Sequence, residues 1–485
     1  MKDYINTNSD ASLSKKHLVK VLWFRNNLRL HDNEALFRAQ QSTVYLLPVY
    51  CIDPVQFEQT ELGFSKTGSF RAQFLLETLH ELRKNLRAKG SDLVVRVGKP
   101  EEEIPFLVAQ TKASMVYSSH EIGTEEAAVV DQLELKLWRH QALLDLCWAG
   151  NLLETEELPF PLKYTPNTFT DFRKQVEKDL PVGEMFPEPE TLPGLIEGVV
   201  PGEIPCLTEL GLDSEATDDR AVLAFRGGES TAIERMHQYI WQQNLLKDYK
   251  ETRNGLLGAD YSTKFSPWLA NGALSVRAIY YEIRKYEAEV IKNKSTWHLI
   301  FELLWREYFR LIARKYQHQI FLQSGIKGAN MSALSSRRKK AFKRWINGET
   351  GIPFIDANMR ELKQTGFMSN RGRQNVASFL TKDLKINWVH GAMYFESQLL
   401  DYDVSSNWCN WNYVAGVGND PREDRYFNIL SQAKRYDNKG KYVKYWLPEL
   451  KNVPESKVHE VGKIKPSEQS EYGVDLGSNY PKPIV

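Results

Sequence analysis

The segment Gly366–Tyr413 constrains the fold of this chain more than any other. In it, a polar run that contains Arg373 leads into an apolar helical pattern that includes Phe379 and Leu380. A helix that buries those apolar side chains also brings Arg373 toward the interior. Because an unpaired buried charge is very costly, the pattern predicts a carboxylate partner for Arg373. Asp401 is the nearest candidate within the segment.

The first part of the chain, residues 17–150, alternates short apolar runs with helical patterns. This order predicts an α/β domain with a doubly wound parallel sheet covered by helices on both faces. No G-x-G-x-x-G follows the first strand, so ordinary dinucleotide binding loses its main support. The predicted strands are Val19–Phe24, Val44–Ile52, Leu93–Val97, Met115–Ser118 and Leu143–Trp148, and the predicted helices are Gly68–Lys89, Glu101–Lys112 and Thr124–Gln141.

The remaining organisation follows from length and composition. At 485 residues the chain is too long for a single core. Residues 1–16 are polar and are expected to form a disordered tail rather than a signal or transit peptide. Residues 151–220, rich in Pro, Gly and Glu, indicate a long surface connector with one short helix at Thr170–Lys178. Residues 221–485 read as a larger all-α domain. It holds nine of the twelve tryptophans, which indicates a large core or a cofactor pocket.

The charge and cysteine patterns limit the partners of the chain. The formal net charge is +1, so any nucleic acid must be held by a local basic patch. The strongest basic run, Ser335–Trp345, is either a solvated helix face or a surface that follows phosphates. Four scattered cysteines, no metal-ligand motif and no apolar run of membrane length favour a reducing, cytoplasmic location.

Two segments of the helical part carry polar groups suited to a ligand. The first has Ser262, Thr263 and Lys264 ahead of a predicted Ser266 N-cap, and such a helix start favours phosphate oxygens. In the second, Glu302 and Trp305 lie three residues apart on one helix face, where one ligand can touch both. The apolar stripe of that second helix is equally typical of plain core.

Together these segments resemble the photolyase and cryptochrome family over about residues 17–485. The motifs are WFRNNLRLHDN at 23–33, with Asn27 where the family usually has Asp, ELLWREYFR at 302–310, and the segment 366–413. The resemblance implies an antenna domain, a connector and a helical domain that binds one FAD non-covalently. It assigns to FAD binding Tyr249, Ser262, Thr263, Lys264, Phe265, Ser266, Arg306, Arg373, Asp401, Asp403 and Asn407.

The resemblance also implies roles beside the flavin ring. The residues matching Arg373 and Asp401 form an ion pair there, and the residue matching Asp403 follows the pyrimidine edge. Asn407 matches the residue that faces flavin N5, where an amide can accept a hydrogen bond. Arg306 has two possible partners in this scheme, the flavin phosphates or Glu307.

An electron-transfer path is a further implication of the resemblance. Trp411, Trp388 and Trp345 match the tryptophans of a path from flavin to surface. Such a path needs closely spaced indole rings, because indole is easily oxidised and tunnelling falls steeply with distance. The outermost tryptophan of the family falls near Ser335, where this chain has no aromatic ring. Either the path ends at Trp345 or another aromatic residue replaces it.

The implied substrate is DNA that contains a cyclobutane pyrimidine dimer. In the family, Glu302 would hydrogen-bond to the dimer and protonate it, and Trp305 would stack on it. The rest of this expected pocket is Asn370, Arg371, Gln374 and Tyr413. Gln374 and Tyr413 replace the Met and Trp of many double-strand photolyases. This favours the cryptochrome DASH branch and repair of single strands, which need little base extrusion.

A second pigment and a second function complete the expectations. Glu121 resembles the acidic residue that holds a folate pterin, which suggests methenyltetrahydrofolate, although it is equally typical of a solvated strand end. The alternative function is a blue-light photoreceptor with little or no repair activity. We expect a monomer that binds DNA and no membrane.

Overall fold

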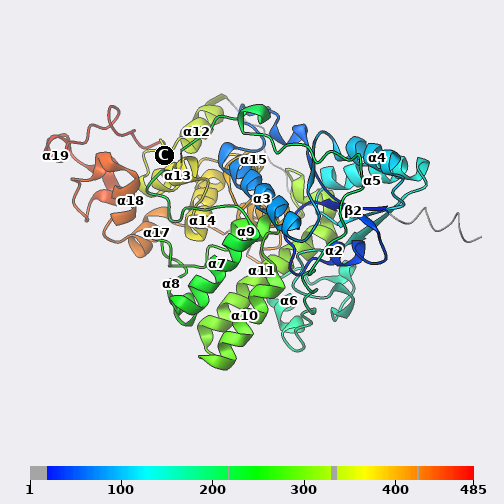
Figure 1. Cartoon of the computed structure of the whole chain (residues 1–485). Helices are drawn as coiled ribbons and strands as arrows, with labels where there is room; N and C mark the ends of the chain where they lie inside the picture. The colour runs from blue at the N-terminus through cyan, green and yellow to red at the C-terminus, as the bar shows by residue number, and fades with distance from the viewer. Residues whose placement is uncertain (1–18, 217, 329–335, 423–424) are drawn as a thin grey trace, which may run out of the picture.

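The structure is a computed structural model that describes residues 19–216, 218–328, 336–422 and 425–485. An α/β part lies beside a larger helical part, with α4 and α5 at one end of the molecule and α18 and α19 at the other (Figure 1). The predicted tail at 1–16 and Ser335 lie outside the described residues. Within the described part, no helix combines the length and apolar character needed to cross a membrane.

The α/β part is built on five parallel strands in the order β3-β2-β1-β4-β5. Side chains alternate between the two faces, so Leu22 and Phe24 join a core beneath α2 and α3. Val21 and Trp23 join a second core beneath α4 and α5. The predicted doubly wound sheet is therefore confirmed. The strands are β1 (Val19–Phe24), β2 (Tyr45–Ile52), β3 (Val94–Val97), β4 (Met115–Ser119) and β5 (Leu143–Cys147).

The helices of this part include one that the sequence did not predict. α2 is only six residues long and starts at its N-cap Asn33, whose side chain accepts a hydrogen bond from the Leu36 N–H at 3.2 Å. Its apolar pattern is too short to stand out from the preceding motif. The helices are α2 (Glu34–Ala39), α3 (Ser69–Ala88), α4 (Pro100–Thr111) and α5 (Thr124–Arg139).

The connector does not simply run over the surface, contrary to the prediction. Its one α-helix, α6 (Phe169–Val176), buries Phe169 and Phe172 in the core of the helical part. Further along, Leu192 and Leu207 pack into the α/β core. Prolines prevent long regular elements but not side-chain burial, so the connector packs on both parts.

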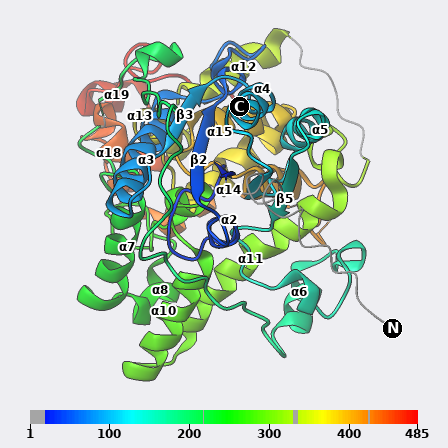
Figure 2. The ribbon, with the colours of Figure 1, turned by 45° about the vertical axis from the view of Figure 1, so that its right-hand side comes forward.

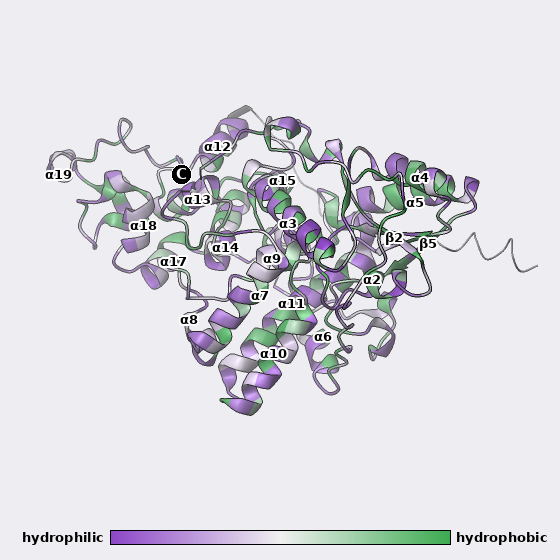
Figure 3. Cartoon of the chain, viewed as in Figure 1, coloured by the Kyte–Doolittle hydropathy of each residue, from purple (hydrophilic) through white to green (hydrophobic). Residues whose placement is uncertain are grey.

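The helical part surrounds one continuous core that includes Trp268, Trp345, Trp388 and Trp411. Figure 2 shows α10 and α11 running side by side away from the sheet. α10 carries both hydrophilic and hydrophobic residues, as a helix with one buried face does (Figure 3). The helices are α7 (Glu229–His237), α8 (Tyr249–Thr252), α9 (Ser266–Ala270), α10 (Val276–Glu289), α11 (Lys294–Tyr316), α12 (Ser336–Ile346), α13 (Pro353–Thr365), α14 (Asn370–Ser378), α15 (Trp388–Gln398), α16 (Val404–Ala415), α17 (Ile429–Tyr436), α18 (Lys441–Trp446) and α19 (Pro466–Tyr472).

Candidate functional site

A cavity of about 510 Å³ lies between α9, α11, α14 and α16, and a second of about 120 Å³ shares part of its wall. All residues that the sequence suggested for FAD or for the dimer line one or both of them. Trp411 lines the smaller cavity, whereas Trp345 and Trp388 lie behind its wall in the core. The structure therefore brings together residues that are up to 164 positions apart, from Tyr249 to Tyr413.

The wall of both cavities holds the ion pair that the sequence predicted. Arg373 Nη2 lies 2.8 Å from Asp401 Oδ2, and Arg373 Nε donates to the Met368 carbonyl at 2.9 Å. The other carboxylate oxygen, Asp401 Oδ1, is buried and has no hydrogen-bond partner within the chain. Because buried polar atoms are normally satisfied, this oxygen marks a position for a donor from a bound group.

Asp403 forms the corner between the two cavities. It caps α16 by accepting a hydrogen bond from the Ser406 N–H at 2.7 Å, and its Oδ2 lies 3.9 Å from Arg310 Nη1. Burial opposes its ionisation, but the charges of Arg306 and Arg310 hold the pKa of Asp403 below its usual value. An anionic side chain therefore faces the cavity at this corner.

Arg306 is held by the backbone just before the connector rather than by Glu307, one of its two expected partners. Its Nη1 donates to the Gly150 carbonyl at 2.6 Å. Glu307 instead accepts a hydrogen bond from the Leu152 N–H at 2.9 Å. Burial and the neighbouring Arg310 charge lower the pKa of Arg306 to about 10, so it remains cationic at neutral pH.

Asn407 directs its amide oxygen toward the smaller cavity. Its Nδ2 donates to the Ala392 carbonyl at 3.0 Å. A carbonyl only accepts hydrogen bonds, so the amide orientation is determined by this contact. The remaining Oδ1 can accept from a group in the cavity that Asn407 lines.

The loop before α9 is fixed from behind by Arg235 of α7. This side chain donates to the carbonyls of Thr263 and Ala259, both at 3.1 Å. Lys264 adopts a positive φ of 62°, and its Nζ donates to Ser262 Oγ at 3.1 Å. The predicted Ser266 cap is wrong by one residue, because the helix already includes Ser266 and follows Phe265 without a side-chain cap.

Glu302 and Trp305 lie together on α11, and neighbouring groups already contact both. Glu302 Oε1 lies 2.8 Å from Arg253 Nη2 and 3.4 Å from His298 Nε2. One face of Trp305 stacks on Phe169 at 3.7 Å between ring centroids, and its edge meets Tyr413 at 6.0 Å. Arg253 and Phe169 were not predicted from the sequence to lie at this site. Nothing in the sequence of α6 indicated that it would cover Trp305.

The mouth of the larger cavity is formed by residues of α11, α14 and α16. Arg371 donates from Nη1 to Gln374 Oε1 at 2.7 Å and from Nη2 to Asn254 Oδ1 at 2.9 Å. Arg425, which was not predicted either, forms an ion pair with Asp420 and donates to the Tyr413 hydroxyl at 3.2 Å. Asn370 is exposed at the start of α14, and two arginines thus line the mouth.

The three tryptophans of the expected path do not form a single row. Trp411 lies 6.4 Å from Trp345 between ring centroids. Trp388 instead meets Trp408 edge-on at 5.8 Å, and its Nε1 donates to the Gln323 carbonyl at 3.0 Å. Ring contacts from Trp411 therefore lead toward Trp345.

A separate cavity of about 390 Å³ lies at the carboxyl ends of β1 and β4, where the strand order reverses. Glu121 lines it but already accepts hydrogen bonds from Asn26 Nδ2 and Ser119 Oγ, both at 2.9 Å. Two further carboxylates of this cavity were not predicted. Glu101 has a buried oxygen without a partner, and burial raises the pKa of Glu126 to about 7.

The two adjoining cavities fit FAD. They offer the unpartnered Asp401 oxygen, the Asn407 amide oxygen, and the cationic Arg306, whose charge suits phosphates. When bound, FAD supplies one-electron redox chemistry and light absorption.

Comparison with known proteins agrees with this geometry. The family model for the FAD binding domain of DNA photolyase matches residues 299–485, and the DNA photolyase model matches residues 20–190. Cryptochrome DASH of Gloeobacter violaceus is 52% identical over 465 residues, which are 96% of this chain and 92% of the relative. Cryptochrome DASH of Danio rerio is 44% identical over 96% of this chain and 90% of the relative.

Solved structures show the same fold. A Synechocystis cryptochrome is 46% identical with a TM-score of 0.93 and 97% coverage of both chains. A class III photolyase from Agrobacterium tumefaciens is 28% identical with a TM-score of 0.81, covering 98% of this chain and 96% of its own. From the FAD-binding fold, the two domain matches and these full-length relatives, the chain belongs to the photolyase and cryptochrome family, in its cryptochrome DASH branch.

Proposed function

We propose that this chain is a blue-light-dependent flavoprotein that binds DNA and splits cyclobutane pyrimidine dimers, preferentially in single strands. The proposal rests on one observation: the residues expected to bind the dimer and those expected to bind FAD line the same cavity. Glu302, Trp305 and Tyr413 line its mouth, and the Arg373–Asp401 pair lines its inner wall. A dimer at the mouth would therefore lie close to a flavin held within.

The residues at the mouth suit a dimer in three ways. Trp305 offers one free stacking direction, because Phe169 covers its other face. Glu302 is held in place by Arg253 at 2.8 Å, so its carboxyl group can hydrogen-bond to a pyrimidine edge. Arg371 supplies positive charge for a flanking phosphate, whereas Arg425 is already paired with Asp420.

The preference for single strands rests on Gln374 and Tyr413. Extruding a damaged base from a duplex costs a few kcal/mol, and stacking on an aromatic ring contributes about 1–3 kcal/mol per base. Tyr413 offers a smaller ring than Trp, and Gln374 offers no apolar wedge. For a duplex substrate, the stacking free energy that is lost is therefore similar in size to the free energy needed to extrude the base.

Repair under blue light on single- and double-stranded dimer DNA, at equal salt, tests the proposal. We expect faster repair of the single strand and a large loss in Glu302→Gln, with the exposed Glu289→Gln on α10 as the matched control. Equal repair of both substrates would refute the strand preference. No repair of either substrate by the reduced, FAD-loaded protein would refute the repair activity.

A blue-light photoreceptor with little repair activity is the second candidate. The observation that favours it is the engagement of the proposed substrate groups with this chain, namely Trp305 with Phe169 and Glu302 with Arg253 and His298. Phe169→Ala separates the two functions. It should raise repair if Phe169 merely narrows the dimer pocket, and should leave repair absent in a photoreceptor.

We also propose that the 390 Å³ cavity of the α/β part holds a folate-type second chromophore. Glu101, Glu121 and Glu126 supply the carboxylates that the donor edge of a pterin needs. Purified protein mixed with methenyltetrahydrofolate should gain its near-ultraviolet absorption band. Glu101→Gln with Glu126→Gln should lose that band while FAD stays bound.

A further inference from the structure

A line of three aromatic rings runs from Trp411 through Trp345 to Tyr394, a tyrosine outside the path that the family resemblance implies. Trp345 lies 6.4 Å from Trp411, and Tyr394 of α15 lies 5.8 Å from Trp345 between ring centroids. Trp345 is wholly buried and its Nε1 donates to the Val376 carbonyl at 3.1 Å, so the middle ring is held in one orientation. The line thus consists of three adjacent oxidisable rings.

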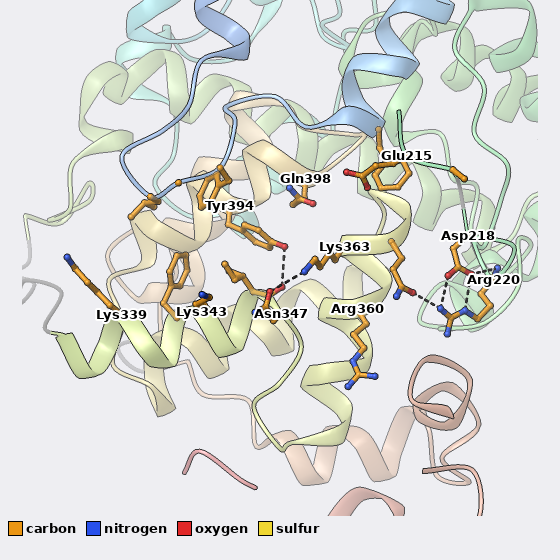
Figure 4. A pocket seen from close by; sticks show the side chains of 18 of the residues that line it. Glu215, Asp218, Arg220, Lys339, Lys343, Asn347, Arg360, Lys363, Tyr394 and Gln398 are labelled. Atoms are coloured by element: carbon orange, nitrogen blue, oxygen red, sulfur yellow. Dashed lines mark hydrogen bonds and ion pairs between the residues drawn. The ribbon is translucent and has the colours of Figure 1, made fainter. Parts of the chain in front are cut away.

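The line ends at a cavity of about 1690 Å³. Tyr394 lines it, although only 4% of the residue is exposed to bulk solvent. Figure 4 shows the phenol directed between α12 and α13, toward Lys363 and Asn347. Oxidation of this ring could therefore be reversed from the cavity without contact with the flavin site.

We propose that Tyr394 is the terminal redox residue of a path Trp411–Trp345–Tyr394, and that this cavity binds a small anionic one-electron reductant. The inference rests on the proposed function only in requiring a bound, photoreducible FAD. It assigns the role of the missing outer tryptophan at Ser335 to a tyrosine on another helix.

The cavity favours an anion on the side formed by α12 and α13. Lys339 and Lys343 of α12 and Lys363 of α13 line this side, and Lys363 Nζ has a neutral partner, Asn347 Oδ1, at 3.1 Å. The arginines of the cavity carry carboxylate partners: Arg220 pairs with Asp218 at 2.6 Å and Arg360 with Glu449 at 2.8 Å. The lysines are therefore the cations best placed for a small anion, whereas Glu61, Glu215 and Asp219 line the cavity as acidic residues.

The phenolic proton of Tyr394 can be transferred to a group in the cavity. The Tyr394 hydroxyl donates to the Ile346 carbonyl at 3.2 Å, and a carbonyl cannot take up a proton at neutral pH. Burial, with the Glu215 carboxylate nearby, raises the pKa of Tyr394, so the intact phenol stays protonated. Once oxidised, the phenol is strongly acidic and releases its proton to the cavity, where Glu215 can accept it.

The electron balance closes with one reductant molecule. Trp411 gives one electron toward the flavin, Trp345 refills Trp411, and Tyr394 refills Trp345 and loses its phenolic proton. A reductant of the ascorbate class then returns one electron and one proton to Tyr394 and leaves as its own one-electron oxidised radical. The net result is transfer of one electron from the reductant to the flavin and of one proton from the reductant to the cavity, with every aromatic residue restored.

Electron paramagnetic resonance on the illuminated, oxidised, FAD-loaded protein tests the path. We expect a tyrosyl signal in the wild type that is lost in Tyr394→Phe and in Trp345→Phe but kept in Trp388→Phe. Tyr394→Phe removes only a hydroxyl, so its flavin content and melting temperature provide the folding control. A tyrosyl signal that persists in Tyr394→Phe, or one that only Trp388→Phe removes, would overturn the proposal.

The reductant site is tested by the decay of that signal with added ascorbate. The decay rate should saturate with ascorbate concentration in the wild type, and Lys343→Gln with Lys363→Gln should make it linear. The matched control is the exposed pair Lys439→Gln with Lys451→Gln, which lies outside this cavity and should leave saturation unchanged. A linear dependence in the wild type refutes binding in the cavity. Protein that fails to retain FAD would instead refute the proposed function.

Discussion

The ion pair of Arg373 and Asp401 is the residue-scale feature on which the inner wall of the flavin cavity depends. One Asp401 oxygen holds Arg373 at 2.8 Å, and the other is buried without a partner. The Asp401 carboxylate therefore holds the Arg373 guanidinium in place with one oxygen, and its other oxygen can accept a hydrogen bond from a bound group. Two further residues matter at this scale: Gly391 leaves room for the Trp411 indole, and Glu361 is a buried carboxyl group with a raised pKa.

We predict that Asp401→Asn weakens both FAD retention and the apoprotein. The amide keeps the shape but removes the charge that faces Arg373, and a hydrogen bond to a charged group is worth about 1.5–3 kcal/mol. The ratio of flavin to protein absorbance after gel filtration and the melting temperature of the apoprotein measure the two effects. The exposed Asp131→Asn on α5 is the control, and retention equal to that of the control would show that the pair does not hold FAD.

Gly391 sets the position of the Trp411 indole. A Cβ at this position would lie 2.3 Å from Trp411 Cη2 and 2.6 Å from Leu380 Cδ2. We therefore predict that Gly391→Ala displaces the indole, destabilises the protein by about 1–3 kcal/mol and slows photoreduction of the flavin. Calorimetry and flash photolysis provide the readouts. Gly194→Ala, whose Cβ would meet only the Gly90 carbonyl at 3.5 Å, should behave like the wild type.

Glu361 gives the protein a defined pH dependence. It is wholly buried, accepts a hydrogen bond from the Tyr442 hydroxyl at 2.6 Å, and its burial raises its pKa from 4.5 to about 8. Between these pH values the folded state keeps a proton that the unfolded state has lost. The stability contributed by this group therefore falls as the pH rises from about 4.5 to about 8 and is constant outside that window.

Glu361→Gln should remove this part of the pH dependence. The melting temperature of the variant relative to the wild type should rise from pH 5 to pH 8 and then level off. Glu289→Gln, at an exposed position, should give a flat difference over the same range. A flat difference for Glu361→Gln as well would mean that this carboxyl group titrates normally in the fold.

At the scale of elements, α11, α14 and α16 each contribute one part of the cavity mouth. α11 carries Glu302 and Trp305, α14 carries Gln374, and α16 carries Tyr413. Helical spacing explains why Glu302 and Trp305 share a face. The meeting of the three helices is a matter of packing, with α6 covering Trp305 from the connector.

The double change Gln374→Met with Tyr413→Trp should raise affinity for duplex dimer DNA more than for single strands. It adds an apolar wedge and a larger stacking ring, and base stacking contributes about 1–3 kcal/mol per base. The ratio of the two dissociation constants at fixed salt is the measurement. Gln243→Met with Tyr445→Trp, outside the cavity, is the control, and an unchanged ratio in the cavity variant would show that these positions do not set strand preference.

At the scale of the whole molecule, the α/β part and the helical part are joined by a buried ionic contact. Asp32 is 2% exposed and lies 2.6 Å from Arg277 Nη2 on α10. Arg29, also buried, donates to the Gly272 carbonyl at 2.8 Å. The cavity at the sheet edge and the flavin cavity also adjoin each other, since Asp403 and Ala270 line both.

We predict that Asp32→Ala uncouples the two parts. Removing one partner of a buried ion pair costs about 3–5 kcal/mol, because Arg277 is then left without its main counter-charge. Calorimetry should show a lower melting temperature and a transition that separates into two. Asp219→Ala, at an exposed position, should unfold in one transition as the wild type does, and a single unshifted transition in Asp32→Ala would show that this contact is dispensable.

The sequence by itself determined the features that depend on local periodicity and on the cost of burying charge. Alternation of apolar runs identified the five strands to within one residue at each end, because a parallel strand is apolar on both faces. The partner of Arg373 was identifiable because a buried guanidinium requires a carboxylate and Asp401 was the nearest candidate. Motifs that resemble those of the photolyase and cryptochrome family then indicated which side chains would line the same cavity.

Only the tertiary structure decided which distant groups meet. Phe169 on Trp305, Arg253 on Glu302 and Tyr394 beside Trp345 join segments between 49 and 136 residues apart, and no local pattern encodes such contacts. The burial of the connector was missed for the same reason, since its prolines exclude regular elements but leave Phe172 and Leu192 free to enter two different cores. Packing across long sequence separations selects these neighbours, and the direction of the ring line from Trp411 follows from that packing.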